Sequence, residues 1–251
     1  MKKAGFACLV MLMLSVPEIW AQPGAIELDM LLNTPVAKTL PQKGILTELR
    51  MYDGGGLLAS IGVGITDQFS IGVSYGGSNI IGSGNVDMNP QPCVQLRALI
   101  KEEQFLSPAI VLGFDSQGYN GYNDALDRYE FKSKGLFIVA SKNTAILGGL
   151  GLHAGANWSL ETKDKDKDVN LFFGAHKWLR SDLILLAEYD MAFNDNADAT
   201  IGEGKGYFNT GVRWSVAQQL YIEFGWKNLF ENRSNVPGSS RTVKLAYLSH
   251  F

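Results

Sequence analysis

Charged side chains recur at every second residue in several stretches of the chain, and in a β-strand such positions lie on one face. Their sign alternates from one stretch to the next, as in Glu188, Arg213 and Glu223. Opposite charges on neighbouring strands can pair across a sheet, so this spacing favours ionic pairing on a shared inner face. We predict an inward-facing charge network that consists of Glu48, Arg50, Arg97, Glu188, Arg213, Glu223 and Lys244.

The other polar residues do not favour catalysis or metal binding. The three histidines, His153, His176 and His250, fall on the same inward face, and no serine stands two residues from any of them. A serine hydrolase needs its nucleophile within hydrogen-bond reach of a base. The stretch NDNADATIGEGK carries Ala199 and Lys205 where a calcium loop needs glycine and glutamate. We therefore expect no catalytic residue, no metal and no cofactor.

The start of the chain predicts export. Two lysines precede an apolar run, and a plausible cleavage site follows Ala21, as in a secretory signal peptide. We predict that residues 1–21 are removed and that residues 22–43, which carry three prolines, form an irregular periplasmic lead-in. Beyond the leader Cys93 is the single cysteine, so no intrachain disulfide can form. The formal charge of −3 gives no reason to expect a nucleic-acid partner.

After residue 43 the hydrophobic pattern alternates in about twelve stretches of roughly ten residues. The connections TDQ, EEQFLSP, KNTAI, RSD and AQQ are short, and most of those between them are long and polar. Transmembrane β-barrels have short periplasmic turns and longer extracellular loops, whereas a soluble periplasmic β-domain has no reason to sort its loops in this way. We predict that residues 44–251 form a transmembrane antiparallel β-barrel of about 12 strands in the bacterial outer membrane.

The chain ends in VKLAYLSHF, where bulky side chains alternate up to a terminal aromatic residue. A soluble β-domain could end in such an edge strand, but in an outer-membrane barrel the same residues close a row that faces lipid. We predict a C-terminal assembly signal at Val243, Leu245, Tyr247 and Phe251. The expected partners of this face are outer-membrane lipid and the barrel-assembly machinery.

The inward charges bear on whether the barrel is open. Six basic and five acidic residues share the inner face: Arg50, Arg97, Lys101, Arg213, Lys227 and Lys244, against Glu48, Asp115, Glu188, Asp190 and Glu223. A channel selective for charged solutes should carry one predominant sign, whereas a balanced set favours pairs across the lumen. We expect a largely filled lumen, with the lead-in 22–43 in its periplasmic mouth. Independent solvated charges that line a water-filled pore are the alternative.

Three stretches of the chain resemble the YjbH-type outer-membrane family, which is associated with exopolysaccharide production. They are Asn33–Gly55, Leu96–Asp124 and Phe137–Asn143 with the LGLHAGANW that follows, and they share patterns of proline, glycine and aromatic residues. The resemblance implies a structural or accessory role connected with surface polysaccharide, with polysaccharide or its export components as partners. A passive porin-like diffusion channel for small solutes is the alternative function.

Overall fold

The computed structural model describes residues 29–145, 149–197, 200–233 and 238–251. The predicted leader, residues 1–21, and the first part of the lead-in lie outside these ranges. No helix that is long and apolar enough to cross a membrane occurs in the described part of the chain.

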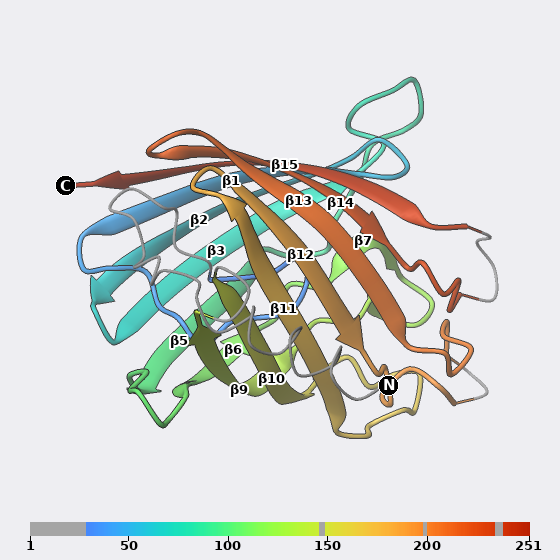
Figure 1. The fold of residues 1–251 in the computed structure, drawn as a ribbon. Coiled ribbons are helices and arrows are strands. Elements are labelled where there is room, and N and C mark those ends of the chain that lie inside the picture. Colours follow the sequence, from blue (N-terminus) through green and yellow to red (C-terminus); the bar gives the residue numbers. More distant parts are fainter. Residues whose placement is uncertain (1–28, 146–148, 198–199, 234–237) are drawn as a thin grey trace, which may run out of the picture.

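Twelve antiparallel strands close into a barrel, as predicted (Figure 1). The barrel strands are β1 (Gly44–Tyr52), β2 (Gly56–Thr66), β3 (Phe69–Ser78), β5 (Cys93–Lys101), β6 (Ala109–Asp115), β9 (Gly135–Thr144), β10 (Leu150–Trp158), β11 (Asn170–Arg180), β12 (Leu183–Asp190), β13 (Tyr207–Ala217), β14 (Leu220–Lys227) and β15 (Ser240–His250). Pairing of β1 with both β15 and β2 joins the last strand to the first and leaves no open edge in the ring.

The two faces of the barrel wall differ as the alternating pattern requires. Apolar side chains such as Ile61, Val73 and Phe224 lie exposed on the outside. The inner face carries glycine, serine and charged residues, and most of its charged side chains are buried. In a soluble protein the apolar side chains face inward, and here they face outward. This arrangement suits a wall that lipid surrounds, because lipid solvates the apolar outer face.

The two rims have connections of different length. Residues 67–68, 181–182 and 218–219 form tight turns at the periplasmic rim, whereas the opposite rim carries mostly long loops, with the short turn 53–55 between β1 and β2 as the exception. The extracellular stretch between β6 and β9, which we expected to be only a loop, contains a hairpin of β7 (Tyr119–Asn123) and β8 (Arg128–Phe131). Its strands are too short for a clear alternating pattern, and they are stabilised by packing of their aromatic side chains inside the barrel mouth. A further short strand, β4 (Asp87–Met88), extends the wall beside β3.

Residues 29–42 form no strand of the wall. They run inside the barrel (the blue coil ahead of β1 in Figure 1), and Met30 and Pro35 form a bridge that turns the segment back on itself. We call residues 29–42 the lumen segment. Two of its leucines press against wall glycines: a Cβ on Gly174 would lie 2.2 Å from Leu31 Cδ1, and one on Gly211 would lie 2.8 Å from Leu32 Cδ2. Glycine at these inward positions therefore makes the space that the lumen segment occupies.

Candidate functional site in the barrel lumen

Three arginines from separate strands of the wall bind the main chain of the lumen segment. Arg50, Arg97 and Arg213 come from β1, β5 and β13, and their exposed fractions are 6%, 2% and 1%. Arg97 Nη1 donates to the carbonyl oxygen of Asp29 at 2.5 Å and lies 3.4 Å from that of Val36. We call these three residues the arginine clamp.

Arg50 binds Leu32 and Asn33 of the lumen segment. Its Nη2 donates to the carbonyl oxygen of Leu32 at 2.8 Å, and its Nη1 donates to Asn33 Oδ1 at 2.9 Å. The guanidinium carbon also lies 4.3 Å from the ring centroid of Tyr119 in the β7–β8 hairpin. Arg50 therefore contacts both the lumen segment, which enters from the periplasmic rim, and the hairpin, which enters from the extracellular rim.

Arg213 combines a carboxylate with main-chain acceptors. Its Nη2 donates to the carbonyl oxygens of Met30 and Leu31, each at 3.0 Å, and its Nε donates to Glu223 Oε2 at 2.8 Å. The register sets Arg213 directly opposite Glu223 on the neighbouring strand. This carboxylate is one reason why the arginine can remain charged inside the barrel.

Glu188 holds the tip of the lumen segment. Its carboxylate accepts hydrogen bonds from the amides of Leu32, Asn33 and Thr34 at 2.9–3.0 Å and from Thr34 Oγ1 at 2.8 Å. Asn209 Nδ2 donates to the same carboxylate at 2.7 Å. Successive amides that point at one anion form a compact binding site for it, and here the anion belongs to the barrel wall. We call this set of bonds the Glu188 latch.

The structure brings most of the predicted charge network together. Lys244 Nζ lies 3.2 Å from Glu48 Oε1 and 3.6 Å from Glu223 Oε1, so a chain of charges runs from Glu48 through Lys244 and Glu223 to Arg213. Glu188 stands apart from this chain, because the residue opposite it in the register is Asn209 and not a basic residue. Arg50 and Arg97 bind main-chain oxygens, as described above.

One of the histidines contacts a serine that is distant from it in the sequence, so the spacing of the residues did not indicate this pair. Ser141 Oγ lies 2.7 Å from His153 Nδ1, and His153 Nε2 lies 2.9 Å from His176 Nδ1. The serine and the histidine are opposite each other in the β9–β10 register, so the hairpin alignment is the signal that would have found them. The amide of Ala37 in the lumen segment donates to Ser141 Oγ at 2.7 Å and covers the hydroxyl. The chain of bonds therefore ties the lumen segment to the wall, and the covered hydroxyl is not open to a substrate.

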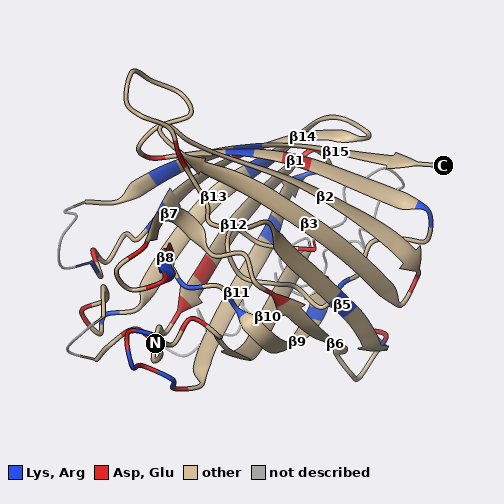
Figure 2. Cartoon of the chain, turned by 180° about the vertical axis from the view of Figure 1, so that it is seen from behind, with Lys and Arg blue, Asp and Glu red and all other residues tan. Residues whose placement is uncertain are grey.

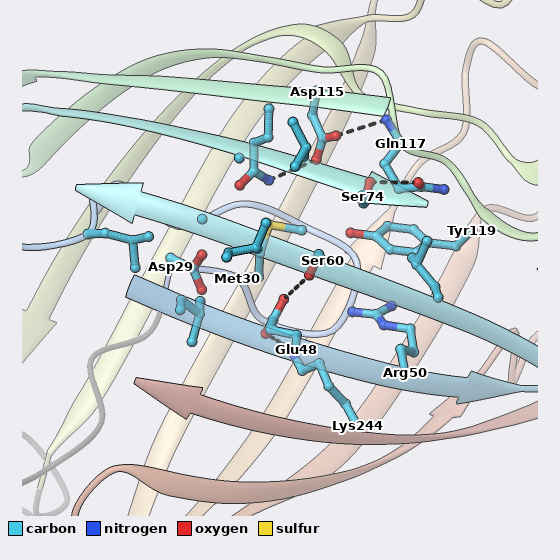
Figure 3. Close-up of a pocket in the computed structure, with 18 residues that line it drawn as sticks. Asp29, Met30, Glu48, Arg50, Ser60, Ser74, Asp115, Gln117, Tyr119 and Lys244 are labelled. Atoms are coloured by element: carbon cyan, nitrogen blue, oxygen red, sulfur yellow. Dashed lines mark hydrogen bonds and ion pairs between the residues drawn. The ribbon is translucent and has the colours of Figure 1, made fainter. Parts of the chain in front are cut away.

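A cavity of about 60 Å³ separates the lumen segment from the wall formed by β1, β2, β3 and β5 (Figure 3). Its polar lining includes Ser60, Ser74, Gln95 and Gln117, and Glu48 points into it. A second cavity of about 20 Å³ lies nearer the extracellular end, beside Tyr207. Each of these two volumes holds a few water molecules at most.

The loops at the extracellular mouth are joined by ion pairs. Figure 2 shows acidic and basic positions gathered on β8 and the loops beside it. Arg128 at the start of β8 lies 2.8 Å from Asp164 and 2.6 Å from Asp195, and all three side chains are almost fully buried. Lys132 lies 2.7 Å from the same Asp164. Three long loops are therefore held together by charges that water does not screen.

Glu161 also belongs to this mouth. Its carboxylate accepts the amides of Tyr129 at 3.0 Å and Ser133 at 2.6 Å, and so fixes the returning half of the β7–β8 hairpin. Burial raises the pKa of Glu161 to about 7, although the two amides and the charge of Arg128 act in the opposite direction. The group is consequently half ionised near neutral pH.

The residues of the predicted C-terminal signal lie on the outer face of β15. Val243 and Leu245 are half-buried, Tyr247 is 47% exposed, and Phe251 is 72% exposed beyond the end of the strand. Lys244 and Ala246 between them point into the lumen. The row thus lies where lipid or another protein can reach it.

Among the described residues, no group of three histidine, cysteine or acidic side chains is placed to hold a metal ion.

No protein-family model matches the chain, and no curated protein matches its sequence. Among solved structures, the KdgM porin is similar over 82% of this chain and 99% of its own, with a TM-score of 0.54 and 11% identity. The KdgM porin in complex with disordered oligogalacturonate covers 83% of this chain and 99% of its own, with a TM-score of 0.51 and 11% identity. Omp33, an outer membrane protein of Acinetobacter baumannii, covers 84% and 98% at 9% identity, with a TM-score of 0.45.

The chain is thus a 12-strand barrel with the fold of outer-membrane porins. The continuous apolar outer face of the barrel agrees with this likeness. The protein is therefore located in the bacterial outer membrane, and outer-membrane lipid surrounds its wall.

Proposed function

We propose that the protein is a porin-like channel for small hydrophilic solutes and that the lumen segment holds it closed. The observation that carries the proposal is the nature of the obstruction. The lumen segment is not a strand of the wall, and polar side chains of the wall bind it through Glu188, Arg50, Arg97 and Arg213. A barrel that is closed by a separable segment can open without breaking any bond of its sheet.

Saccharides are the solutes that we propose. A KdgM porin with a similar barrel is described in complex with oligogalacturonate. In the present chain the wall behind the cavity offers hydroxyls and amides, including those of Ser60, Ser74 and Gln95. Side chains of this kind can exchange hydrogen bonds with a sugar as it passes.

A disulfide lock tests this function. A Cβ on Gly174 would lie beside the side chain of Leu31, so the double variant Leu31→Cys/Gly174→Cys should join the lumen segment to β11. We expect the oxidised full-length protein to be silent in planar lipid bilayers and the reduced protein to show stepwise openings. Glu188→Gln should open more often than the unmodified protein, because a neutral amide accepts the three backbone amides less strongly. Heat-modifiable gel mobility reports whether each variant is folded, and folded variants that never conduct would contradict the channel.

A structural or accessory role connected with surface polysaccharide is the second candidate. The YjbH-type resemblance suggests it, and the small cavity volumes favour a barrel that does not conduct. Loss of exopolysaccharide in a strain without the protein, restored by the oxidised disulfide-locked variant, would favour this role. A requirement for the reduced form would favour the channel.

We also propose that residues 1–21 direct export and that Val243, Leu245, Tyr247 and Phe251 are recognised by the barrel-assembly machinery. The exposed outer row of β15 supports the second part. Deletion of Phe251, or Phe251→Ser, should lower the amount of protein in the outer membrane, whereas His250→Ser beside it should not. An unchanged membrane level of the deletion would contradict the signal. N-terminal sequencing of the membrane form tests cleavage after residue 21.

A further inference from the structure

The arginine clamp is unusual in the kind of partner that it has. Buried arginines are normally paired with carboxylates, because the uncompensated charge is costly to remove from water. Within the described ranges Arg50 and Arg97 have no carboxylate oxygen within 4 Å, and their main partners are neutral carbonyl oxygens. The direct partners of these two buried guanidinium groups are therefore neutral, although the charges of Glu48, Glu188 and Glu223 act on Arg50 from a greater distance.

A third buried basic side chain lies near them. Lys227 on β14 is fully buried, and its Nζ has no hydrogen-bond partner. The Nζ atom lies over two rings of the extracellular hairpin, at 5.0 Å from the centroid of Tyr119 and 5.8 Å from that of Phe131. Arg50 lies 4.3 Å from the same Tyr119 ring, so the two cations share one aromatic neighbour.

The acidic residues described in the lumen form no direct ion pair with these three basic side chains, because most of those acidic residues already have other partners. Glu223 and Glu48 share Lys244 and Arg213, and Asp115 accepts Gln95 Nε2 at 3.0 Å. If the lumen segment left, the Glu188 carboxylate would lose its bonds to that segment and would keep the bond from Asn209. Arg50, Arg97 and Lys227 would then have no carboxylate partner in the described wall.

We propose that the arginine clamp is an anion-binding site for carboxylate-bearing saccharides and that the lumen segment occupies it as an internal competitor. This inference rests on the channel function proposed above. A guanidinium presents two parallel N–H groups that match a carboxylate, and such pairs are stronger than bonds to neutral carbonyls. An acidic saccharide therefore gains more from the clamp than the lumen segment does.

The lumen segment offers the clamp several oxygen acceptors in a row. The carbonyl oxygens of four successive residues, Asp29, Met30, Leu31 and Leu32, are all bound by the clamp where the segment bends back on itself. A linear chain of acidic sugars also presents oxygen acceptors at regular intervals. A ligand that binds the clamp only when the lumen segment has left shifts the population towards the open barrel.

The test compares an acidic with a neutral trisaccharide of similar size. Trigalacturonate, added to the full-length protein in planar bilayers, should raise the open probability several-fold, whereas maltotriose should leave it unchanged. The variant Arg97→Gln weakens both competitors, so it should open more often without ligand and should bind trigalacturonate about tenfold more weakly in calorimetry. The matched control is Arg180→Gln, an exposed arginine at the periplasmic rim that pairs with Asp182, and it should behave as the unmodified protein.

Three outcomes would overturn the inference. An equal response to the two sugars, or unchanged affinity in Arg97→Gln, would mean that the clamp serves only to hold the lumen segment. Openings in Glu188→Gln without any preference for the acidic sugar would also overturn it, while leaving the channel function intact. Folded variants that never conduct would remove both the inference and the channel function on which it rests.

Discussion

The extracellular mouth and the middle of the lumen both bury basic side chains, but the two regions neutralise them differently. In the mouth Arg128 and Lys132 meet the carboxylates of Asp164 and Asp195, and Arg233 meets Glu130. In the middle of the lumen Arg50 and Arg97 meet peptide carbonyls, and Lys227 meets aromatic rings.

This difference bears on which of the two regions can rearrange. Separation of an ion pair between loops leaves two charges without their partners, so such a pair resists opening. Water or an anion can replace a carbonyl oxygen at a guanidinium, and this exchange costs less free energy than separating an ion pair. The comparison therefore favours mouth loops that stay fixed in place and a central segment that can be exchanged.

The largest expected effect is that of Arg213→Ala. This change removes the ion pair between Arg213 and Glu223, which lies in the middle of the lumen. The change leaves Glu223 with the more distant Lys244 and removes two bonds to the lumen segment. We expect a loss of about 3–5 kcal/mol, measured as a lower melting temperature in detergent. Lys165→Ala in an exposed loop is the control and should change stability by less than about 0.5 kcal/mol. Equal melting points of the two variants would contradict a structural role for the charge network.

The next effect concerns the mouth. Arg128→Ala leaves Asp164 and Asp195 buried without their guanidinium. We expect faster proteolysis within the loop of residues 116–134, while the barrel strands stay resistant, because the loops open without the wall. Lys163→Ala on the exposed surface of a neighbouring loop is the control. An unchanged rate of cleavage in this loop of the variant would show that these ion pairs do not hold the loops in place.

The variant Lys227→Met should change stability by a smaller amount, and it should raise stability instead of lowering it. The variant removes a buried ammonium that has no hydrogen-bond partner and keeps a side chain of similar length. Removal of the desolvated charge should outweigh the loss of its ring contacts, and we expect a gain of up to about 1 kcal/mol in detergent melts. A clear loss of stability would mean that the lysine has a structural role instead of a role in binding.

The smallest effect is the pH response of the mouth through Glu161. Its pKa of about 7 in the folded loop lies above the ordinary value of 4.5, so the folded loop binds the proton more tightly than the open loop. The resulting stabilisation is complete below about pH 4.5 and is lost as the pH rises through 7. Hydrogen-exchange protection of the Tyr129 and Ser133 amides, corrected for intrinsic rates, should fall between pH 5 and pH 8. Glu161→Gln should abolish this dependence, and an equal fall in that variant would assign it to another group.

The sequence by itself determined the wall of this protein. Strand number, the inward and outward faces and the alternation of turn and loop lengths are local properties, because a period of two and a turn depend on neighbouring residues. The same reasoning placed Arg213, Glu223, Lys244 and Glu48 on one face of adjacent strands, and the register sets Arg213 opposite Glu223 and Glu223 opposite Lys244.

Only the tertiary structure decided what fills the barrel. The partners of Glu188 are amides more than 150 residues away along the chain, and those of Arg50 and Arg97 are carbonyls of an irregular segment without any pattern of its own. The contact between Ser141 and His153 depends on the exact alignment of two strands, which the alternating pattern does not give. Main-chain amides and carbonyls are the same in every residue, so no sequence pattern marks which of them a buried charge will bind.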